Sequence, residues 1–436
     1  MPSPSELLNV LICPVGTIGD WNPLLAAAVE LLRRGHRVTM IGNDAFEQHA
    51  AEIGAKFVGV HGGERLEYLK RPECLTYSGG YRHHLPVQCL EPLRPTFAAL
   101  RRLNEPGRTV VVASNWSFGA RVAREVLAIP TATVHTDPHT LRSARGILRM
   151  PPPMVVGDWV FRWYMRLQFY VADRFFIDPL CRDELNDFRA EYGLAPVRRV
   201  MHEWWNSPDL VLGLFPEWWA APQPEWPRKT RLVGFPVYDR NEHRKVSEST
   251  QRFLAAGSQP FVFSPGNSHL HTTRYFAAAA EACRKLGRRG LLITKRRDEV
   301  PAALPDDVAH SEFEPFQELL PNAAAIVHHG GTGSIAAAFR AGIPQVSLPA
   351  NFNQPDAAAR VVKLGVGRTL DADRITAESL SRALLELTTS PTVAARCREL
   401  AARHGHPQEA ARRAADLVER LISTADSTPK THEAAA

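Results

Sequence analysis

The succession of a short apolar run, a glycine turn and a helix recurs along this sequence, and no other feature constrains the fold as much. Near the N-terminus, residues 8–15 form a predicted buried strand, Gly16 to Gly19 a turn, and residues 22–34 a helix. Farther on, residues 325–328 form a predicted strand that precedes Gly330-Gly-Thr-Gly333 and a second helix. Repeated units of this kind are typical of parallel α/β sheets with helices on both faces. The sequence therefore predicts two doubly wound α/β halves.

The domain organisation follows from where this alternation stops and restarts. We expect a first domain over residues 1–235, a second over 236–423 and a flexible tail over 424–436, which is polar and rich in alanine. Residues 151–230 interrupt the alternation and are dense in aromatic side chains. They predict helices and loops that pack on the first domain. The aromatic residues fit ordinary core. They also fit an apolar acceptor pocket or, with three interspersed arginines, a surface that touches lipid.

Composition narrows the class of protein. Of the 436 residues, 44% are hydrophobic and 22% are charged, which excludes a disordered chain, a collagen and a small disulfide scaffold. No apolar run is long enough to span a bilayer. The net charge of +6 is too small for a nucleic-acid signature. The six cysteines form no Cys-x-x-Cys pair, and no basic residue precedes the first apolar run. We therefore expect a cytoplasmic protein with reduced thiols.

The loop after the strand at 325–328 carries the strongest chemical signal. Three glycines let the backbone approach a ligand closely, and the following helix directs free N–H groups and its positive dipole end at the loop. This arrangement predicts a phosphate site in which His329 and Ser334 add an imidazole and a hydroxyl donor. The alternative is a tight turn in which Ser334 caps the helix.

Two further loops follow strands of the same half, so their side chains are expected at the same edge of the sheet. One contains Gly266, Asn267 and Ser268. The other contains Asn353 and Gln354, whose amide groups suit sugar hydroxyls. The alternative for each is an ordinary polar loop. Asp371-Ala-Asp373 matches the Asp-x-Asp pattern of some metal sites. It stands before a predicted helix, however, which favours a capping role.

The order of these elements resembles the C-terminal half of nucleotide-sugar glycosyltransferases with the GT-B fold, the UDP-glycosyltransferase family. His329-Gly-Gly-Thr-Gly-Ser334 is similar to the loop that holds the donor diphosphate in that family. Asn353-Gln354 is similar to the pair that holds the donor sugar, and Phe313-Glu-Pro-Phe316 to the stretch that stacks on the nucleobase. The opening Gly16-Thr-Ile-Gly-Asp20 resembles the acceptor-side loop. The resemblance runs from about residue 9 to about residue 420 and is closest to bacterial rhamnolipid rhamnosyltransferases.

The resemblance implies two Rossmann-like domains facing across a cleft, the first for the acceptor and the second for the nucleotide sugar. It implies an inverting, metal-independent transfer of a hexose from a UDP- or dTDP-sugar to a hydroxyl of an apolar small molecule or lipid. No cofactor, metal or nucleic acid is expected. Contact with the inner face of a membrane and the oligomeric state stay open. A non-catalytic sugar-nucleotide binder and an epimerase of the same fold remain alternatives. A nicotinamide oxidoreductase is not an alternative, because the first turn lacks the Gly-x-Gly-x-x-Gly pattern of dinucleotide-binding proteins.

The resemblance also implies roles for single residues. His329, Ser334 and the backbone at Gly331, Thr332 and Gly333 hold the donor diphosphate, and Gly266, Asn267 and Ser268 close on it. Phe313 and Phe316 contact the nucleobase, and Asn353 and Gln354 contact the donor sugar. Asn353 stands where the family has an aspartate, which weakens the case for a plain glucose donor.

The acceptor side departs from the family at the catalytic position. The usual histidine of the opening loop is absent, and Asp20 stands there as the candidate base, with helix capping as the alternative. An ordinary aspartate, with a pKa of about 3.9, is a weak base for an alcohol. Gly19 and Asn115 are expected beside it. His135 is a second candidate base or a core histidine.

Overall fold

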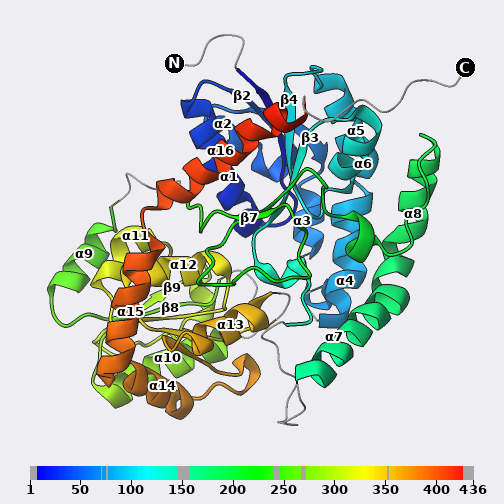
Figure 1. Ribbon diagram of the computed structural model, residues 1–436. Helices are drawn as coiled ribbons and strands as arrows, with labels where there is room; N and C mark the ends of the chain where they lie inside the picture. Colours follow the sequence, from blue (N-terminus) through cyan, green and yellow to red (C-terminus); the bar gives the residue numbers. More distant parts are fainter. Residues whose placement is uncertain are drawn as a thin grey trace, which may run out of the picture. The chain divides into compact units, whose positions relative to one another are not determined.

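The protein folds into two compact units, seen in a computed structural model that describes residues 7–69, 71–74, 77–145, 158–238, 245–266, 272–350 and 353–425. Among these residues, the first unit comprises the chain up to 145, residues 158–238 and residues 406–425. The second unit comprises residues 245–405. Each unit contains one parallel sheet covered by helices, so the predicted α/β class and doubly wound architecture are confirmed (Figure 1).

The first unit is built on a seven-stranded parallel sheet in the order β3-β2-β1-β4-β5-β6-β7. Its strands are β1 (Asn9–Cys13), β2 (Arg37–Asn43), β3 (Lys56–His61), β4 (Thr109–Ser114), β5 (Thr131–His135), β6 (Leu210–Gly213) and β7 (Thr230–Leu232). Its helices are α1 (Ile18–Arg33), α2 (Glu47–Glu52), α3 (Glu64–Leu69), α4 (Tyr77–Leu85), α5 (Leu93–Leu103), α6 (Phe118–Leu127), α7 (Asp158–Ala172), α8 (Asp178–Ala190) and α16 (Pro407–Ala425).

Alternate side chains of the central strands supply both cores of this unit, because successive residues of a strand point to opposite faces. Val10 and Ile12 of β1 pack with α1 and α16 on one face. Leu11 and Cys13 pack with α5, α6 and α8 on the other. All five residues of β1 are buried, which explains why the strand is an almost continuous apolar run.

The second unit is built on a six-stranded parallel sheet in the order β10-β9-β8-β11-β12-β13. Its strands are β8 (Phe261–Ser264), β9 (Gly290–Ile293), β10 (Val308–Ser311), β11 (Ala325–His328), β12 (Gln345–Ser347) and β13 (Gly367–Thr369). Its helices are α9 (Glu248–Ala255), α10 (Thr272–Leu286), α11 (Phe316–Leu319), α12 (Thr332–Ala341), α13 (Gln354–Lys363), α14 (Ala377–Thr389) and α15 (Pro391–His404). Phe263 and Val327 pack with α10 and α14 on one face of the sheet, and Val262 and Ile326 pack with α11 and α12 on the other.

The segment 151–230, expected to form helices and loops on the first domain, also contains β6, and β7 begins at its last residue. Both strands complete the sheet of the first unit. These strands have only 4 and 3 residues, too short for their pattern to stand out among the surrounding aromatic residues. The aromatic side chains divide into two groups. Trp204, Trp205, Trp219 and Trp226 are buried, whereas Trp159 and Trp163 of α7 are exposed.

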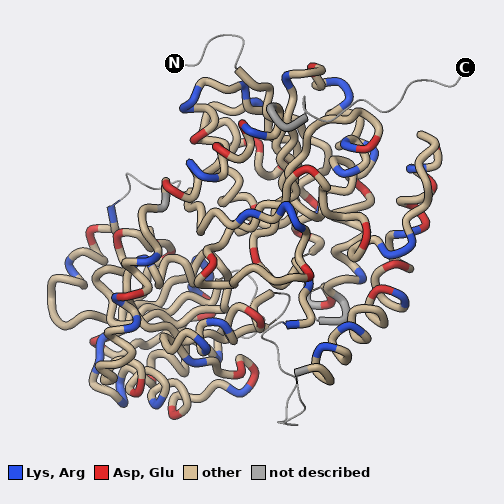
Figure 2. Tube along the Cα trace, in the orientation of Figure 1, with Lys and Arg blue, Asp and Glu red and all other residues tan. Residues whose placement is uncertain are grey.

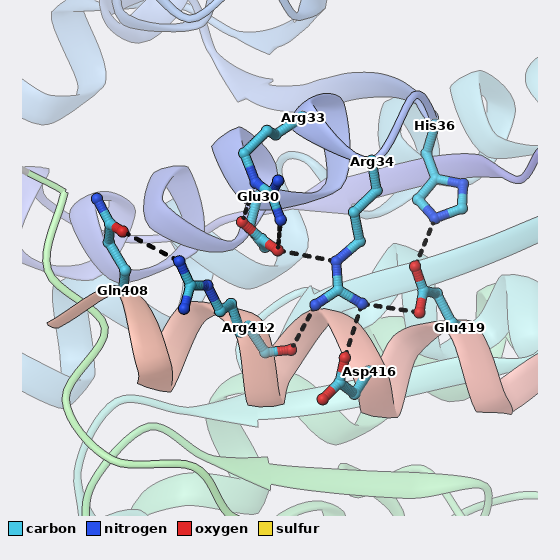
Figure 3. A network of polar contacts seen from close by, with 8 residues as sticks. All are labelled: Glu30, Arg33, Arg34, His36, Gln408, Arg412, Asp416 and Glu419. Atoms are coloured by element: carbon cyan, nitrogen blue, oxygen red, sulfur yellow. Dashed lines mark hydrogen bonds and ion pairs between the residues drawn. The ribbon is translucent and has the colours of Figure 1, made fainter. Parts of the chain in front are cut away.

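The C-terminal helix α16 packs on the first unit, although its sequence position placed it in the expected second domain. An ionic cluster anchors it to α1 (Figure 3). The guanidinium of Arg34 donates to Glu30 at 2.9 Å, to Asp416 at 2.7 Å and to Glu419 at 2.8 Å. Hydrogen bonds from Arg33, followed by those from Arg34, lower the pKa of Glu30 to about 2 despite its burial. These contacts join residues nearly 400 positions apart, which helical periodicity cannot reveal.

Removing Arg34 should therefore loosen the C-terminal helix. We expect Arg34→Met to cost about 2 kcal/mol of stability in the first unit, because it leaves three carboxylates without a shared cation at a site only partly open to solvent. Hydrogen exchange of residues 407–425 should accelerate. Arg33→Met is the matched control, since Arg33 pairs with the same Glu30 but its side chain is 64% exposed, against 19% for Arg34. Equal exchange rates in the two variants would contradict this account.

Candidate active site

The strand order reverses between β1 and β4 in the first sheet, and between β8 and β11 in the second. Ligands of open α/β sheets bind outside the carboxyl ends of the strands at such reversal points. Each unit therefore has one favoured place for a ligand. The loops singled out in the sequence follow β1, β4 and β5 in the first unit, and β8, β11 and β12 in the second.

In the second unit, the imidazole of His329 lies directly against two glycine backbones. A Cβ placed on Gly266 would overlap Cε1 and Nδ1 of this ring, and one placed on Gly331 would overlap Nε2. Gly266 also has a φ of +70°, a conformation that favours glycine. The structure thus brings the loops after β8 and β11 together, as the sequence predicted. Asn267 and Ser268 lie outside the described residues.

A second histidine, which the sequence reasoning left without a role, fixes the shape of the glycine loop. His328 is fully buried. Its Nδ1 accepts a hydrogen bond from the Gly330 amide at 2.9 Å, so Nε2 is the protonated nitrogen and donates to Gln345 Oε1 at 2.9 Å. Burial lowers the pKa of His328 to about 4, so the ring stays neutral. In the sequence, the one sign of this role for His328 was its position directly before His329.

Helix α12 begins one turn earlier than a Ser334 cap requires. Its N-cap is Gly331, and Ser334 is the third helical residue, so the capping alternative for Ser334 is wrong. The first i→i−4 hydrogen bond runs from Ile335 to Gly331. The amides of Thr332, Gly333 and Ser334 precede it and point out of the helix end with the positive end of the dipole. The geometry suits an anion beside His329.

The loop after β12 reaches the same glycine turn. Asn353 Nδ2 lies 3.5 Å from Thr332 Oγ1, and the Cα and carbonyl oxygen of Gln354 pack against Gly330. Gln354 is buried, and its Oε1 accepts from the Ala350 amide at 2.9 Å. Gln354 therefore also shapes this loop. Asp371 accepts from the Asp373 amide at 2.9 Å, which confirms that this pair caps a turn.

The two aromatic residues proposed for the nucleobase differ in their surroundings. Phe313 is 45% exposed just beyond β10, whereas Phe316 is partly buried against the apolar cluster under α11 and α12. Between them, Glu314 is buried and accepts hydrogen bonds from Ser247 and Thr250. Burial alone would raise the pKa of Glu314, but these bonds outweigh it and the pKa is lowered. Phe313 is thus the better placed of the two for stacking.

In the first unit, Asp20 closes a capping box at the start of α1. Its Oδ2 accepts from the Thr17 amide at 2.8 Å and from the Thr17 hydroxyl at 3.2 Å. Gly16 has a φ of +117°, and a Cβ there would overlap the Asp20 carboxylate. Asp20 therefore takes part in capping, but as the third helical residue; the N-cap itself is Thr17 and not Asp20 as the alternative had it. The two bonds from Thr17 do not use all of the hydrogen-bonding capacity of the Asp20 carboxylate, because a carboxylate has about four acceptor sites.

The pKa of Asp20 is raised from 3.8 to about 6. Burial is the main cause, and the negative charge of Asp137 adds to it, while the bonds from Thr17 oppose it. Asp137 is itself buried and accepts from the His139 amide at 3.1 Å. Its pKa is lowered, since contacts with His139 outweigh the effect of burial. Sequence reasoning missed Asp137, although it follows β5 directly.

The other expected acceptor-side residues have different environments. His135 is fully buried, with Nδ1 2.6 Å from Thr140 Oγ1 and Nε2 2.7 Å from Asn206 Oδ1. Burial lowers its pKa to about 4. These contacts fit a core histidine, the other role that the sequence offered for it. Asn115 is buried with Nδ2 lacking a hydrogen-bond partner among the described residues, so it can donate to a ligand oxygen. A Cβ placed on Gly19 would lie 3.6 Å from Thr17 Oγ1, an ordinary van der Waals contact.

Comparisons with known proteins identify the family. The C-terminal domain model of the erythromycin biosynthesis protein CIII-like family matches residues 291–417. The glycosyltransferase GtfC of Amycolatopsis orientalis is 30% identical over 395 residues, which cover 86% of this chain and 89% of GtfC. The chain belongs to the EryCIII-like glycosyltransferases of the GT-B type.

A further relative and a solved structure align over nearly the whole chain. The O-mycaminosyltylonolide 6-deoxyallosyltransferase of Streptomyces fradiae is 26% identical over 90% of this chain and 93% of its own. The structure of the glycosyltransferase VinC in complex with dTDP superposes with a TM-score of 0.68 at 20% identity, covering 95% of this chain and 100% of VinC. The GT-B fold is thus shared, and the protein is an enzyme of the glycosyltransferase class.

A pocket in the first unit of this glycosyltransferase adjoins the Asp20 loop. Its wall is mostly apolar and includes Trp21, His61 and Gln88. The remaining lining residues are Pro14, Val15, Gly16, Ile41, Gly42, Asn43, Val60, Leu66, Pro92, Thr96 and Ser117. It lies beyond β1, β2 and β3 rather than in the aromatic segment where the sequence analysis placed a possible acceptor pocket.

The packing of the His329 imidazole against the backbones of Gly266 and Gly331, which we call the seat of His329, can be tested with two alanine variants. We expect Gly331→Ala to lower stability by about 1–3 kcal/mol, because the new Cβ displaces the imidazole. Gly333→Ala is the matched control. A Cβ there meets no atom within 4 Å, and alanine is a better helix former. Thermal unfolding without ligand should separate the two variants, and equal melting temperatures would mean that the ring does not occupy this seat.

Proposed function

We propose that the protein is an inverting, metal-independent glycosyltransferase that moves a hexose from a UDP- or dTDP-sugar to a hydroxyl of an apolar small molecule or lipid. The observation that carries the proposal is the seat of His329 against Gly266 and Gly331, at the N-terminus of α12 and the reversal point of the second sheet. Backbone amides, an imidazole and a helix dipole together form a site for a diphosphate.

The donor side supplies hydrogen-bond donors for the negative charge that forms on a departing nucleoside diphosphate. Charge builds on the diphosphate as the bond to the anomeric carbon breaks, and preorganised donors stabilise that charge without moving. His329 and the amides at residues 332–334 are such donors. Asn353 and Gln354 are proposed to bond the sugar hydroxyls, and Phe313 to stack on the base. The complex of the structural neighbour VinC with dTDP supports thymidine diphosphate as one nucleotide of the donor.

The acceptor side supplies a carboxylate whose pKa suits proton removal near neutral pH. The acceptor oxygen forms the new bond at the anomeric carbon from the face opposite the diphosphate, so the configuration inverts. Its proton passes to Asp20, and the bonding pair leaves with the diphosphate. The pKa of about 6 removes the objection that an ordinary aspartate is too weak. A non-catalytic binder would need no such group, which favours an enzyme over that alternative.

The acceptor is proposed to be a mainly apolar molecule with a free hydroxyl. The cavity beside the Asp20 loop has a volume of only about 30 Å³, but its wall is largely apolar, so the surface next to the candidate base is apolar. The name of the Streptomyces fradiae relative describes transfer of a deoxysugar to a macrolide, which supports acceptors of this kind. Incubation with UDP- and dTDP-hexoses and a panel of macrolide, phenolic and hydroxy-fatty-acid acceptors tests the proposal by mass spectrometry. Product must form in the presence of EDTA; a requirement for a divalent metal would contradict the metal-independent mechanism.

The role of Asp20 has a distinct signature in pH. We expect Asp20→Asn to lower turnover at least about 100-fold while leaving nucleotide affinity unchanged. In the wild type, kcat/KM should fall below pH of about 6, because the base is lost as Asp20 is protonated. Thr17→Ala keeps the base but removes a hydrogen bond that stabilises its charged form, so the acidic limb should move to higher pH. A limb that stays in place would show that another group titrates.

A further inference from the structure

One face of α7 exposes a row of large apolar side chains. Trp159 and Trp163 are 72% and 63% exposed, and Leu167, Tyr170 and Val171 are also exposed. The helix continues into a π-helical turn (Asp173–Ile177) in which Phe175 and Phe176 are exposed too. The spacing of three, four and seven residues places these side chains on one side of the helix. A soluble surface rarely leaves so many aromatic rings uncovered in one place.

The same face carries positive charge without exposed negative charge. Arg166 and Arg174 fall at the same helical spacing and are exposed. The only carboxylates in residues 159–182, Asp173 and Asp178, are both buried. Asp173 is neutralised by Arg142 at 2.5 Å and Arg199 at 2.7 Å. We call the exposed set the α7 face; it consists of Trp159, Trp163, Arg166, Leu167, Tyr170, Val171 and Arg174. Figure 2 shows Lys and Arg recurring along this helix.

An open groove extends the α7 face. Its wall includes Tyr170, Arg174 and Arg198, the buried carboxylate of Asp178, and two arginines that are already paired, Arg182 with Asp183 at 2.9 Å and Arg199 with Asp173 at 2.7 Å. The guanidinium of Arg199 also lies 5.6 Å from the ring centroid of Tyr170, a cation–π contact at the edge of the α7 face. Guanidinium groups bind phosphate oxygens through paired hydrogen bonds. The groove therefore suits phosphate headgroups, and the neighbouring helix suits the apolar layer beneath them.

We propose that the α7 face and this groove dock on an anionic lipid surface, with α7 lying in the plane of the interface. Helices of this kind bury tryptophan and leucine at the headgroup boundary and hold anionic lipids with arginine. In the part of the chain that is described, no helix is long and apolar enough to cross a bilayer. A symmetric dimer would bring the arginines of one copy against those of the other, so charge complementarity favours lipid over a second copy.

Vesicle sedimentation with the full-length protein tests this inference without measuring transfer activity, so its failure and that of the proposed function are distinguishable. We expect binding to vesicles of equal parts phosphatidylcholine and phosphatidylglycerol, little binding to phosphatidylcholine alone, and release by salt. Arg166→Gln/Arg174→Gln should weaken partitioning on the order of fivefold for each arginine. Trp159→Ala/Trp163→Ala should weaken it as well, because apolar contact is lost.

The matched control changes one exposed arginine and one exposed apolar residue of α14, as Arg382→Gln/Leu385→Ala. It should bind vesicles like the wild type. Failure of the wild type to sediment with anionic vesicles would overturn the inference, as would equal binding by all variants. So would a wild-type dimer in sedimentation equilibrium that the tryptophan variant abolishes, because a second copy would then cover the face.

Discussion

The donor side of this enzyme depends on one packing contact, the imidazole of His329 against the backbones of Gly266 and Gly331. Neither position tolerates a side chain while the ring keeps its place, so the loops after β8 and β11 must adopt their shapes together. His328 adds to this constraint from inside the sheet by holding the Gly330 amide and Gln345. The two adjacent histidines therefore have different roles. The buried His328 shapes the loop, and the more accessible His329 faces the proposed anion site.

The acceptor side shows how packing changes the chemistry of an unremarkable residue. Asp20 takes part in capping α1, as many helix-start aspartates do, yet burial and the nearby charge of Asp137 raise its pKa to about 6. The pKa of Asp137 moves in the opposite direction through its contacts with His139. Carboxylates whose pKa values are driven apart in this way are typical of acid–base sites. Gly16 makes the arrangement possible by leaving room for the Asp20 carboxylate.

Much of this could be predicted from sequence because parallel sheets impose strict rules. Once Gly266, His329 and Asn353 were assigned to loops after parallel strands, their meeting at one edge followed. Features that depend on distant partners could not be predicted. The return of α16 rests on Arg34 contacting Asp416 and Glu419. The same holds for the aromatic segment, where Trp204 is buried and Trp159 is exposed although local composition is alike.

The most direct measurement is a calorimetric titration of dTDP and UDP into the wild type and into His329→Ala, both in EDTA. The account predicts that at least one of the two nucleotides binds the wild type without metal. It also predicts that the variant loses about 1.5–3 kcal/mol of binding free energy, the range for a hydrogen bond to a charged group. His310→Ala, which changes a histidine bonded to the Thr294 carbonyl, is the control and should bind normally. Unchanged nucleotide affinity in His329→Ala, or no binding of either nucleotide, would contradict the central claim that the glycine loop beside His329 is the donor diphosphate site.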